Sequence, residues 1–203
     1  MSAHHLPNAG VFLNTSSSYG NPKDGRRKLL ISSSLGAKAY SIHDAADASS
    51  PPLYTFESHH RKPNFILASR TMPSLAAADF HVLRPHISLT LSSGTFDIKS
   101  KAAVRSSYSW TSLNTGNRLS WEPQGRYSDM LLMDGEHARL LARLRSDGWG
   151  GKHSGELELI GQSGVPGPFM DEVVATCMAV RLWVFRSRMS AGAGASIVGA
   201  GVM

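Results

Sequence analysis

The chain has 203 residues, of which 41% are hydrophobic and 18% are charged. That balance is too apolar for a disordered chain, and the sequence lacks the uninterrupted apolar run that a membrane span requires. Lysine and arginine (21) exceed aspartate and glutamate (15) by six, which favours partners that carry phosphate groups, such as lipid headgroups or nucleic acid.

The cysteine count bears on the cellular compartment. Cys177 is the one cysteine, which excludes an internal disulfide framework and a cysteine-rich zinc site. The N-terminal residues show no basic segment followed by an apolar one, so no secretory signal is expected. We predict a cytoplasmic protein, with a nuclear location or peripheral membrane attachment as alternatives.

Residues 1–26 are rich in Asn, Ser, Gly and Pro and show no sustained hydrophobic period, which is typical of a disordered leader. From residue 28 to residue 160, apolar and polar residues alternate in short runs that are separated by turn-forming clusters. In one such run Ile87, Leu89 and Leu91 alternate with polar neighbours. This period of two predicts half-buried antiparallel strands.

Counting all such runs gives about a dozen strands joined by hairpin-length loops. The runs lie near 28–33, 37–42, 52–57, 64–70, 79–83, 86–91, 94–99, 107–111, 118–122, 127–133, 137–145 and 156–159. In the run 137–145, one face is expected to carry Ala138, Leu140, Ala142 and Leu144, and the other His137, Arg139, Leu141, Arg143 and Arg145. A meander of so many strands is expected to curl and close.

A helix is predicted over residues 169–188. Asp171 and Glu172 at its start and Arg186 and Arg188 at its end suit the helix dipole. Its middle is apolar on nearly every side, so protein or lipid should surround it. Residues 191–203 are expected to form a flexible Gly/Ala tail.

The apolar stretch of this helix is shorter than the roughly 20 residues that cross a bilayer. A barrel of about twelve strands, by contrast, leaves a lumen wide enough for a helix of about 10 Å diameter. We therefore predict a mainly β domain at 27–190, a closed antiparallel barrel that encloses its hydrophobic C-terminal helix. Arg181 should then reach a barrel mouth or bond to carbonyl or carboxylate oxygens. The expected core includes Trp110, Trp121, Met178, Val180 and Trp183.

Several segments in this order resemble the Tubby C-terminal-like superfamily, and most closely its LURP-one-related branch and uncharacterised fungal members. They are Tyr108-Ser109-Trp110, Leu119-Ser120-Trp121, Leu141-Ala142-Arg143-Leu144, Gly155-Glu156-Leu157-Glu158-Leu159 and Asp171-Glu172-Val173-Val174-Ala175-Thr176. The resemblance covers residues 28–188 and implies the barrel with a central helix. The superfamily holds phosphoinositide-binding Tubby domains, phospholipid scramblases and many proteins of unknown role.

Two basic clusters are candidate phosphate contacts. Arg61 and Lys62 end the densest one, which precedes Pro63, and their donors suit a phosphate group, although a solvated hairpin loop explains them as well. Arg26, Arg27 and Lys28 form the second, for which a nuclear signal and a chance cluster are the alternatives.

The arginines of the run 137–145 form a third basic feature. Arg139, Arg143 and Arg145 are expected on one strand face, where they would meet an anionic surface or pair with Glu156 and Glu158 of the next strand. Pairing across the strands is the simpler explanation.

Residues for catalysis or metal binding do not form a recognisable pattern. The nine histidines lack ligand spacing, so no metal and no other cofactor is expected. No Gly-x-Ser-x-Gly motif occurs, and Cys177 lies inside the predicted helix. Trp110 and Trp121 fit a barrel wall better than a base-stacking surface, so nucleic acid is not an expected partner.

The sequence favours a non-enzymatic binding or scaffold module that engages an anionic phospholipid headgroup or a protein partner. The first alternative is a membrane-associated scramblase-like protein anchored by its C-terminal segment. The second is an enzyme that acts on a small molecule held at a barrel mouth, which requires convergent titratable groups in one pocket.

Overall fold

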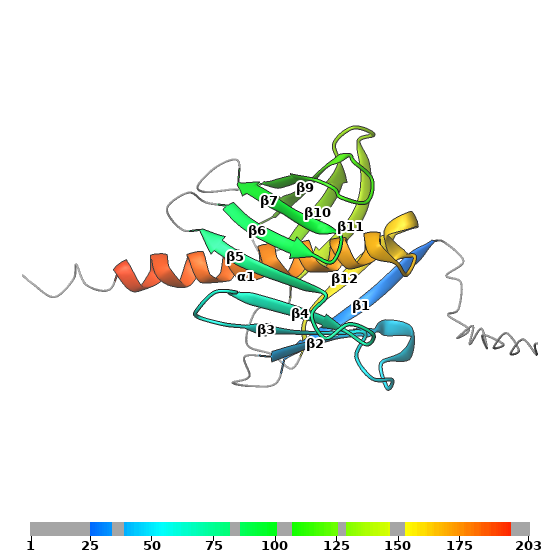
Figure 1. Cartoon of the computed structure of the whole chain (residues 1–203), viewed down its shortest axis with the longest axis horizontal. Coiled ribbons are helices and arrows are strands. Elements are labelled where there is room, and N and C mark those ends of the chain that lie inside the picture. The colour runs from blue at the N-terminus through cyan, green and yellow to red at the C-terminus, as the bar shows by residue number, and fades with distance from the viewer. Residues whose placement is uncertain are drawn as a thin grey trace, which may run out of the picture.

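The computed structural model of the chain describes residues 25–33, 39–81, 86–100, 107–125, 129–146 and 153–195. Within them, twelve antiparallel strands close into one barrel, and strands that are adjacent in the chain are adjacent in the sheet (Figure 1). The barrel closes where the first strand pairs with the last. The strands are β1 (Arg26–Ser33), β2 (Ala39–Asp44), β3 (Tyr54–Ser58), β4 (Phe65–Ser69), β5 (Ala76–His81), β6 (His86–Leu91), β7 (Gly94–Ser100), β8 (Tyr108–Thr111), β9 (Arg118–Gln124), β10 (Asp129–Asp134), β11 (Arg139–Arg145) and β12 (His153–Ile160).

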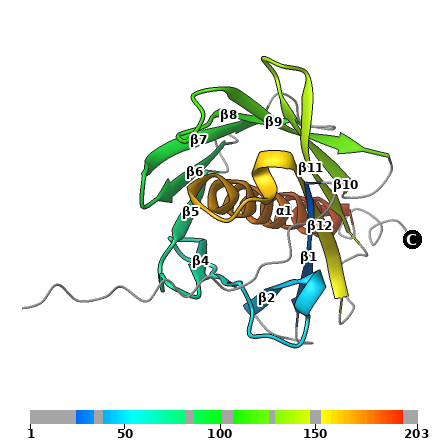
Figure 2. The ribbon, with the colours of Figure 1, turned by 90° about the vertical axis from the view of Figure 1, so that its right-hand side faces the viewer.

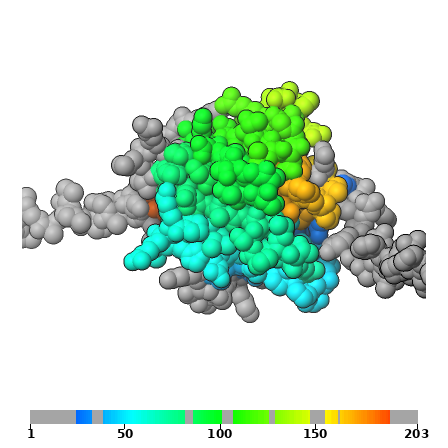
Figure 3. All heavy atoms as spheres, viewed as in Figure 1, coloured from blue at the N-terminus to red at the C-terminus, as the bar shows by residue number. Residues whose placement is uncertain are grey.

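A long helix, α1 (Pro168–Ala195), follows the last strand and runs through the barrel. The end-on view shows the strands arranged around it (Figure 2). In the space-filling view the barrel wall covers the middle of the helix, whose atoms appear only near its two ends (Figure 3). Two short 3-10 helices, η1 (Ala45–Asp47) and η2 (Gly161–Gly164), lie in connections. The predicted barrel with an enclosed C-terminal helix is confirmed.

The barrel wall alternates as the period of two predicts, because successive side chains of a strand point to opposite faces. In β6, Ile87, Leu89 and Leu91 are buried, whereas Ser88 and Thr90 lie on the outer face. The helix is buried all round, and seven of its apolar side chains are at most 1% exposed: Val173, Val174, Ala175, Cys177, Met178, Ala179 and Val180. Each large apolar side chain buried in this way contributes about 1.5 to 3 kcal/mol, so the helix forms the centre of the core.

The five side chains expected in the core are buried in the structure, none of them more than 9% exposed. They are Trp110, Trp121, Met178, Val180 and Trp183. Both indole N–H groups of the strand tryptophans find acceptors on the helix. Trp121 donates to Oγ1 of Thr176 at 3.2 Å, and Trp110 donates to Oε1 of Glu172 at 2.8 Å.

The ends of the domain differ slightly from prediction. β1 begins at Arg26, the last residue of the expected leader. The helix continues past 188 to Ala195, so residues 191–195 are helical where a flexible tail was expected. Extending an existing helix is easy, and alanine has the highest helix propensity. Residues 1–24 and 196–203, the rest of the expected leader and tail, lie outside the described residues.

The expected alternation is wrong in β11, because this strand carries one extra residue relative to β10. Leu132 pairs with Ala142 and Met133 pairs with Leu140, so Leu141 has no pairing partner of its own on β10. This β-bulge turns the side chain of Leu141 into the core, where it is 2% exposed. Leu140, expected inside, is only partly buried.

The bulge also separates residues that were expected to share a face. A shift of one residue reverses the side to which all earlier side chains of the strand point. Arg139 therefore does not lie on the face of Arg143 and Arg145, and Ala138 and His137 fall in the exposed turn before the strand. The predicted single arginine stripe is wrong.

The two ends of the barrel can be named by the helix. At the entry mouth α1 begins, and Asn114 of the β8–β9 connection donates to the carbonyl oxygen of Pro168. At the exit mouth α1 leaves the barrel, and Arg186 contacts the β3–β4 connection at 59–64. The helix extends beyond the strands at the exit mouth (Figure 1).

Gly155 of β12 has φ +151°, and a Cβ there would overlap the backbone carbonyl oxygen of Arg145 and approach Nη1 of Arg181 to 3.2 Å. We expect Gly155→Ala to lower the free energy of unfolding by about 1 to 3 kcal/mol through overlap and backbone strain. Chemical denaturation measures the change. Gly116→Ala is the control, because Gly116 also has positive φ, but a Cβ added there would meet no described atom within 4 Å. Equal losses in both variants would contradict the overlap.

Candidate functional site: a basic barrel mouth

Arg186 fixes the β3–β4 connection at the exit mouth. Its Nη2 donates to the carbonyl oxygen of His59 at 2.6 Å and to the hydroxyl of Ser58 at 2.9 Å. Its guanidinium lies over the Phe80 ring at 5.2 Å from the centroid, and that ring packs edge-on against Trp183. Burial lowers the pKa of Arg186 from its ordinary value. Arg186 thus attaches α1 to the loop that carries the first predicted basic cluster.

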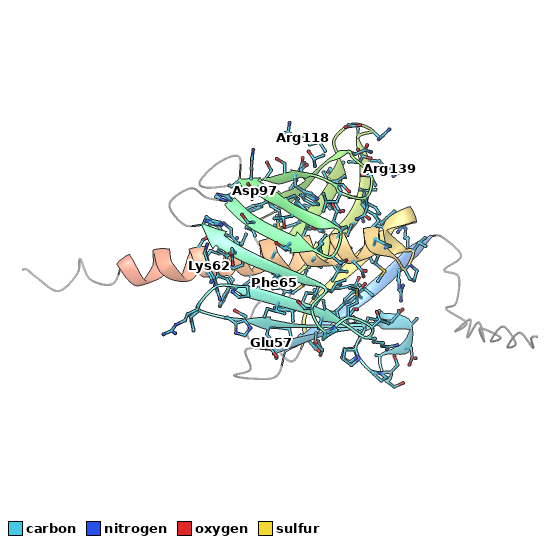
Figure 4. All side chains as sticks on the ribbon, viewed as in Figure 1. Glu57, Lys62, Phe65, Asp97, Arg118 and Arg139 are labelled. Carbon is cyan, nitrogen blue, oxygen red and sulfur yellow. The ribbon has the colours of Figure 1, made fainter. Side chains whose placement is uncertain are left out.

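The predicted contacts Arg61 and Lys62 lie in this loop, and both are exposed. Nζ of Lys62 is 3.6 Å from a carboxylate oxygen of Asp79, in a pair that is open to solvent on both sides. Arg188, two residues beyond Arg186 in the helix, is also exposed. We call Arg61, Lys62, Arg186 and Arg188 the exit-mouth cations. Lys62 lies toward the end of the barrel from which α1 projects (Figure 4).

A shallow depression of about 320 Å³ adjoins Lys62 on the outer wall. It is lined by Lys62, Pro63, Ala77, Ala78, Asp79, Ser88 and Thr90. The small alanine side chains leave the space, but its polar groups already have partners: Lys62 pairs with Asp79, and the Ser88 hydroxyl donates to Asp97 at 2.7 Å. The depression by itself therefore shows no preference for an anion.

The second predicted cluster is not part of the same site, because β1 begins at the entry mouth. Arg27 points inward and donates to Oδ2 of Asp44 from Nη2 at 2.8 Å and from Nε at 3.0 Å. Arg26 and Lys28 point outward and pair with Glu158 at 3.5 Å and with Glu156 at 3.1 Å. Arg26 and Lys28 therefore form ion pairs across the β1–β12 closure of the barrel, and Arg27 links β1 to β2.

The pairing proposed for the β11 arginines agrees with the strand register. Arg143 lies opposite Glu158, and Arg145 lies opposite Glu156. The two glutamates of β12 therefore lie between basic residues of β11 on one side and basic residues of β1 on the other. Cross-strand neighbours of opposite charge stabilise a sheet, which explains these arginines without a ligand.

Arg181 is 2% exposed and lies near the exit mouth, as expected. Its Nη2 donates to the hydroxyl of Ser146, at the end of β11, over 3.5 Å. One turn earlier, burial raises the pKa of the Cys177 thiol to about 12, although the charge of Arg181 acts in the opposite direction. The thiol is therefore protonated at neutral pH and packs as a small apolar side chain in the core.

Glu172 is a buried carboxylate with several hydrogen-bond donors around it, an environment that the sequence did not indicate. Expected as a helix-dipole charge, it is 0% exposed and accepts hydrogen bonds from Trp110, Ser112 and Asn114. The backbone N–H of Asn114 also donates to it. These donors tie the first turn of α1 to the β8–β9 hairpin, which gives the carboxylate a structural role.

In the described part of the chain, no helix is long and apolar enough to cross a membrane. The same residues contain no group of three side chains arranged to hold a metal ion. No family model, curated protein or solved structure matches the chain. The resemblance to the Tubby C-terminal-like superfamily therefore stays a prediction.

Proposed function

We propose that the protein is a non-enzymatic binding module that engages anionic phospholipid headgroups through its exit-mouth cations. The observation that carries the proposal is the position of Arg61, Lys62 and Arg188, three exposed cations at the barrel end from which α1 emerges. A membrane that faces this end meets the projecting helix and the β3–β4 loop together. Membership of the Tubby C-terminal-like superfamily belongs to the same proposal, supported by the barrel with its central helix.

The strength of the attraction follows from the exposure of these groups. Each basic residue near an anionic leaflet contributes about 1 kcal/mol, and the attraction fades beyond a Debye length of about 8 Å at physiological salt. Asp79 reduces the contribution of Lys62. Arg186 also orders the β3–β4 loop, because its guanidinium donates to the neutral hydroxyl of Ser58 and the carbonyl oxygen of His59 and keeps its charge. Binding is therefore weak, salt-sensitive and peripheral.

We expect the double variant Arg61→Glu plus Lys62→Glu to bind anionic vesicles about thirtyfold more weakly, since the loss of two such cations removes about 2 kcal/mol. Sedimentation with vesicles of phosphatidylcholine that contain phosphatidylserine or a phosphoinositide measures this, at low and at physiological salt. The control is Arg70→Glu plus Arg118→Glu, an equal charge change on two exposed residues at the other end of the barrel, outside any proposed site. Once the effect of its lower net charge at low salt is subtracted, this control should bind the vesicles about as well as the unmodified protein does.

Three outcomes would overturn the proposal. Equal binding by both double variants removes the exit mouth from the interaction. Binding of the unmodified protein to none of the anionic vesicles favours the scaffold alternative with a protein partner. Association that resists high salt and survives Arg61→Glu plus Lys62→Glu favours the scramblase-like alternative anchored by the C-terminal segment.

A further inference from the structure

A pocket of about 230 Å³ opens at the entry mouth, at the other end of the molecule from the exit-mouth cations. The β8–β9 connection, the β10–β11 turn and the first turn of α1 surround it. Its lining residues are Thr115, Asn117, Leu119, Asp134, His137, Arg139, Leu141 and Phe169. Apart from Arg139 and His137, which were expected on one face of the run 137–145, none of these side chains was expected at a site.

Asp134 organises the polar side of the pocket from a position that is 2% exposed. Its Oδ2 lies 3.0 Å from Nδ1 of His137 and accepts from Nδ2 of Asn117 at 3.1 Å. Its Oδ1 accepts from the backbone N–H groups of Glu136 and His137. Burial by itself would raise the pKa of Asp134, but these hydrogen bonds hold it below the ordinary value.

The ionised Asp134 fixes how His137 presents its ring. A carboxylate only accepts hydrogen bonds, so Nδ1 of His137 carries the hydrogen in this contact. The side chain is 64% exposed, and its Nε2 remains for a ligand. Four donors occupy the two carboxylate oxygens of Asp134. With Nδ1 donating to Asp134, Nε2 of His137 is an acceptor in the neutral ring and a donor in the imidazolium, so the imidazole is a hydrogen-bonding group of fixed orientation at the pocket rim.

Arg139 adds a permanent positive charge to the same rim, at the far end of the barrel from Lys62 (Figure 4). The β-bulge at Leu141 places it there, away from the face of Arg143 and Arg145. Between His137 and Arg139, Ala138 adopts φ +49°, a left-handed conformation that residues other than glycine seldom take. Such strain, retained next to a pocket, is often associated with a functional site.

The apolar part of the pocket lining consists of Leu119, Leu141 and Phe169. A cationic rim above an apolar wall selects ligands that combine both properties. We propose that this pocket binds a small organic oxyanion, a carboxylate or phosphate monoester whose anionic head contacts Arg139 and His137 and whose apolar group lies against Phe169. Charge-assisted hydrogen bonds from the guanidinium hold the head, and Nε2 of His137 adds a donor when the imidazolium forms next to the bound anion.

Nuclear magnetic resonance of the isotope-labelled full chain tests the proposal, with phenyl phosphate and benzoate as probes. Benzyl alcohol and sodium chloride at matched ionic strength serve as the uncharged and the simple-anion controls. We expect saturable shifts of the His137 ring and the Arg139 guanidinium with one or both oxyanions. Preference for phenyl phosphate or for benzoate identifies the head group. Neither control should saturate the same signals.

Two variants locate the interaction. Arg139→Gln and His137→Gln should each raise the dissociation constant about tenfold, in line with the loss of one charge-assisted contact. Arg61→Glu plus Lys62→Glu should leave it unchanged, because those residues lie at the exit mouth. Vesicle binding by Arg139→Gln should likewise be unchanged, so the two proposals fail separately.

The proposal is overturned if the oxyanions produce only linear, unsaturated shifts. It is also overturned if benzyl alcohol saturates the signals as well as benzoate does, which would indicate an apolar cavity alone. Unchanged affinity in both Arg139→Gln and His137→Gln, with their folds verified by the amide spectrum, would exclude the rim as the binding group.

Discussion

Replacing Glu172 by alanine is expected to lower the free energy of unfolding by about 3 to 5 kcal/mol. The substitution leaves the indole N–H of Trp110 and the hydroxyl of Ser112 without their acceptor in the interior, and it removes one acceptor of the exposed Asn114. Each unsatisfied buried group costs about 1 to 3 kcal/mol, and relaxation of the hairpin recovers part of the sum. Chemical denaturation monitored by tryptophan fluorescence measures the loss.

Two further variants make the Glu172 prediction specific. Glu172→Gln keeps the size of the side chain and one acceptor oxygen. It should therefore lower the free energy of unfolding, but by less than Glu172→Ala does. Glu136→Ala removes an exposed acid near the same mouth and should change stability by less than about 0.5 kcal/mol. If Glu172→Ala unfolds at the same denaturant concentration as Glu136→Ala, the carboxylate is not the link between helix and barrel.

Trp183→Ala is expected to cost about 3 to 5 kcal/mol, because it removes a large buried side chain from the core. The Trp183 ring packs edge-on against Phe80 at 5.5 Å between centroids, and Arg186 covers the same Phe80 ring. The cavity should therefore also loosen the β3–β4 loop that carries Arg61 and Lys62.

Trp183→Phe provides the matched comparison, since it retains an aromatic ring at this position. It should lose clearly less stability than Trp183→Ala in the same denaturation assay. Hydrogen exchange of the β3–β4 loop should increase in Trp183→Ala and change little in Trp183→Phe. A cost below about 1 kcal/mol for Trp183→Ala would mean that the helix is not tightly packed at the exit mouth.

The sequence predicted the architecture well because two simple patterns of apolar residues dominate it. Alternation at period two predicted the strands, and the all-round apolar stretch that ends near Trp183 predicted an enclosed helix. What the pattern missed depended on local geometry: Leu141 is apolar on either face, so a bulge there leaves no trace in the alternation. The helix end was also missed, since Gly192 and Gly194 resemble a flexible tail.

The candidate sites were predictable only where the residues lie close together in sequence. Arg61 and Lys62 are adjacent, and their exposure fits a loop. The partners of Arg26 are set by the closure of the barrel, which brings it to Glu158 across 132 positions, and no local pattern encodes that contact. Asp134 and His137 were available as an acid and a histidine three positions apart in a turn, but burial of the acid became apparent only in the fold.

The order of the elements along the chain also bears on when this protein can fold relative to its synthesis. Of the described elements, the helix that fills the lumen is synthesised after all twelve strands, and the strand pair that closes the wall joins β1 to β12. Contacts of such long sequence separation form slowly, and the strands leave the ribosome with their apolar faces and edges uncovered. We therefore expect the barrel to complete its fold only after α1 has been synthesised, and a chain truncated within α1 to aggregate because the apolar faces of its strands stay uncovered.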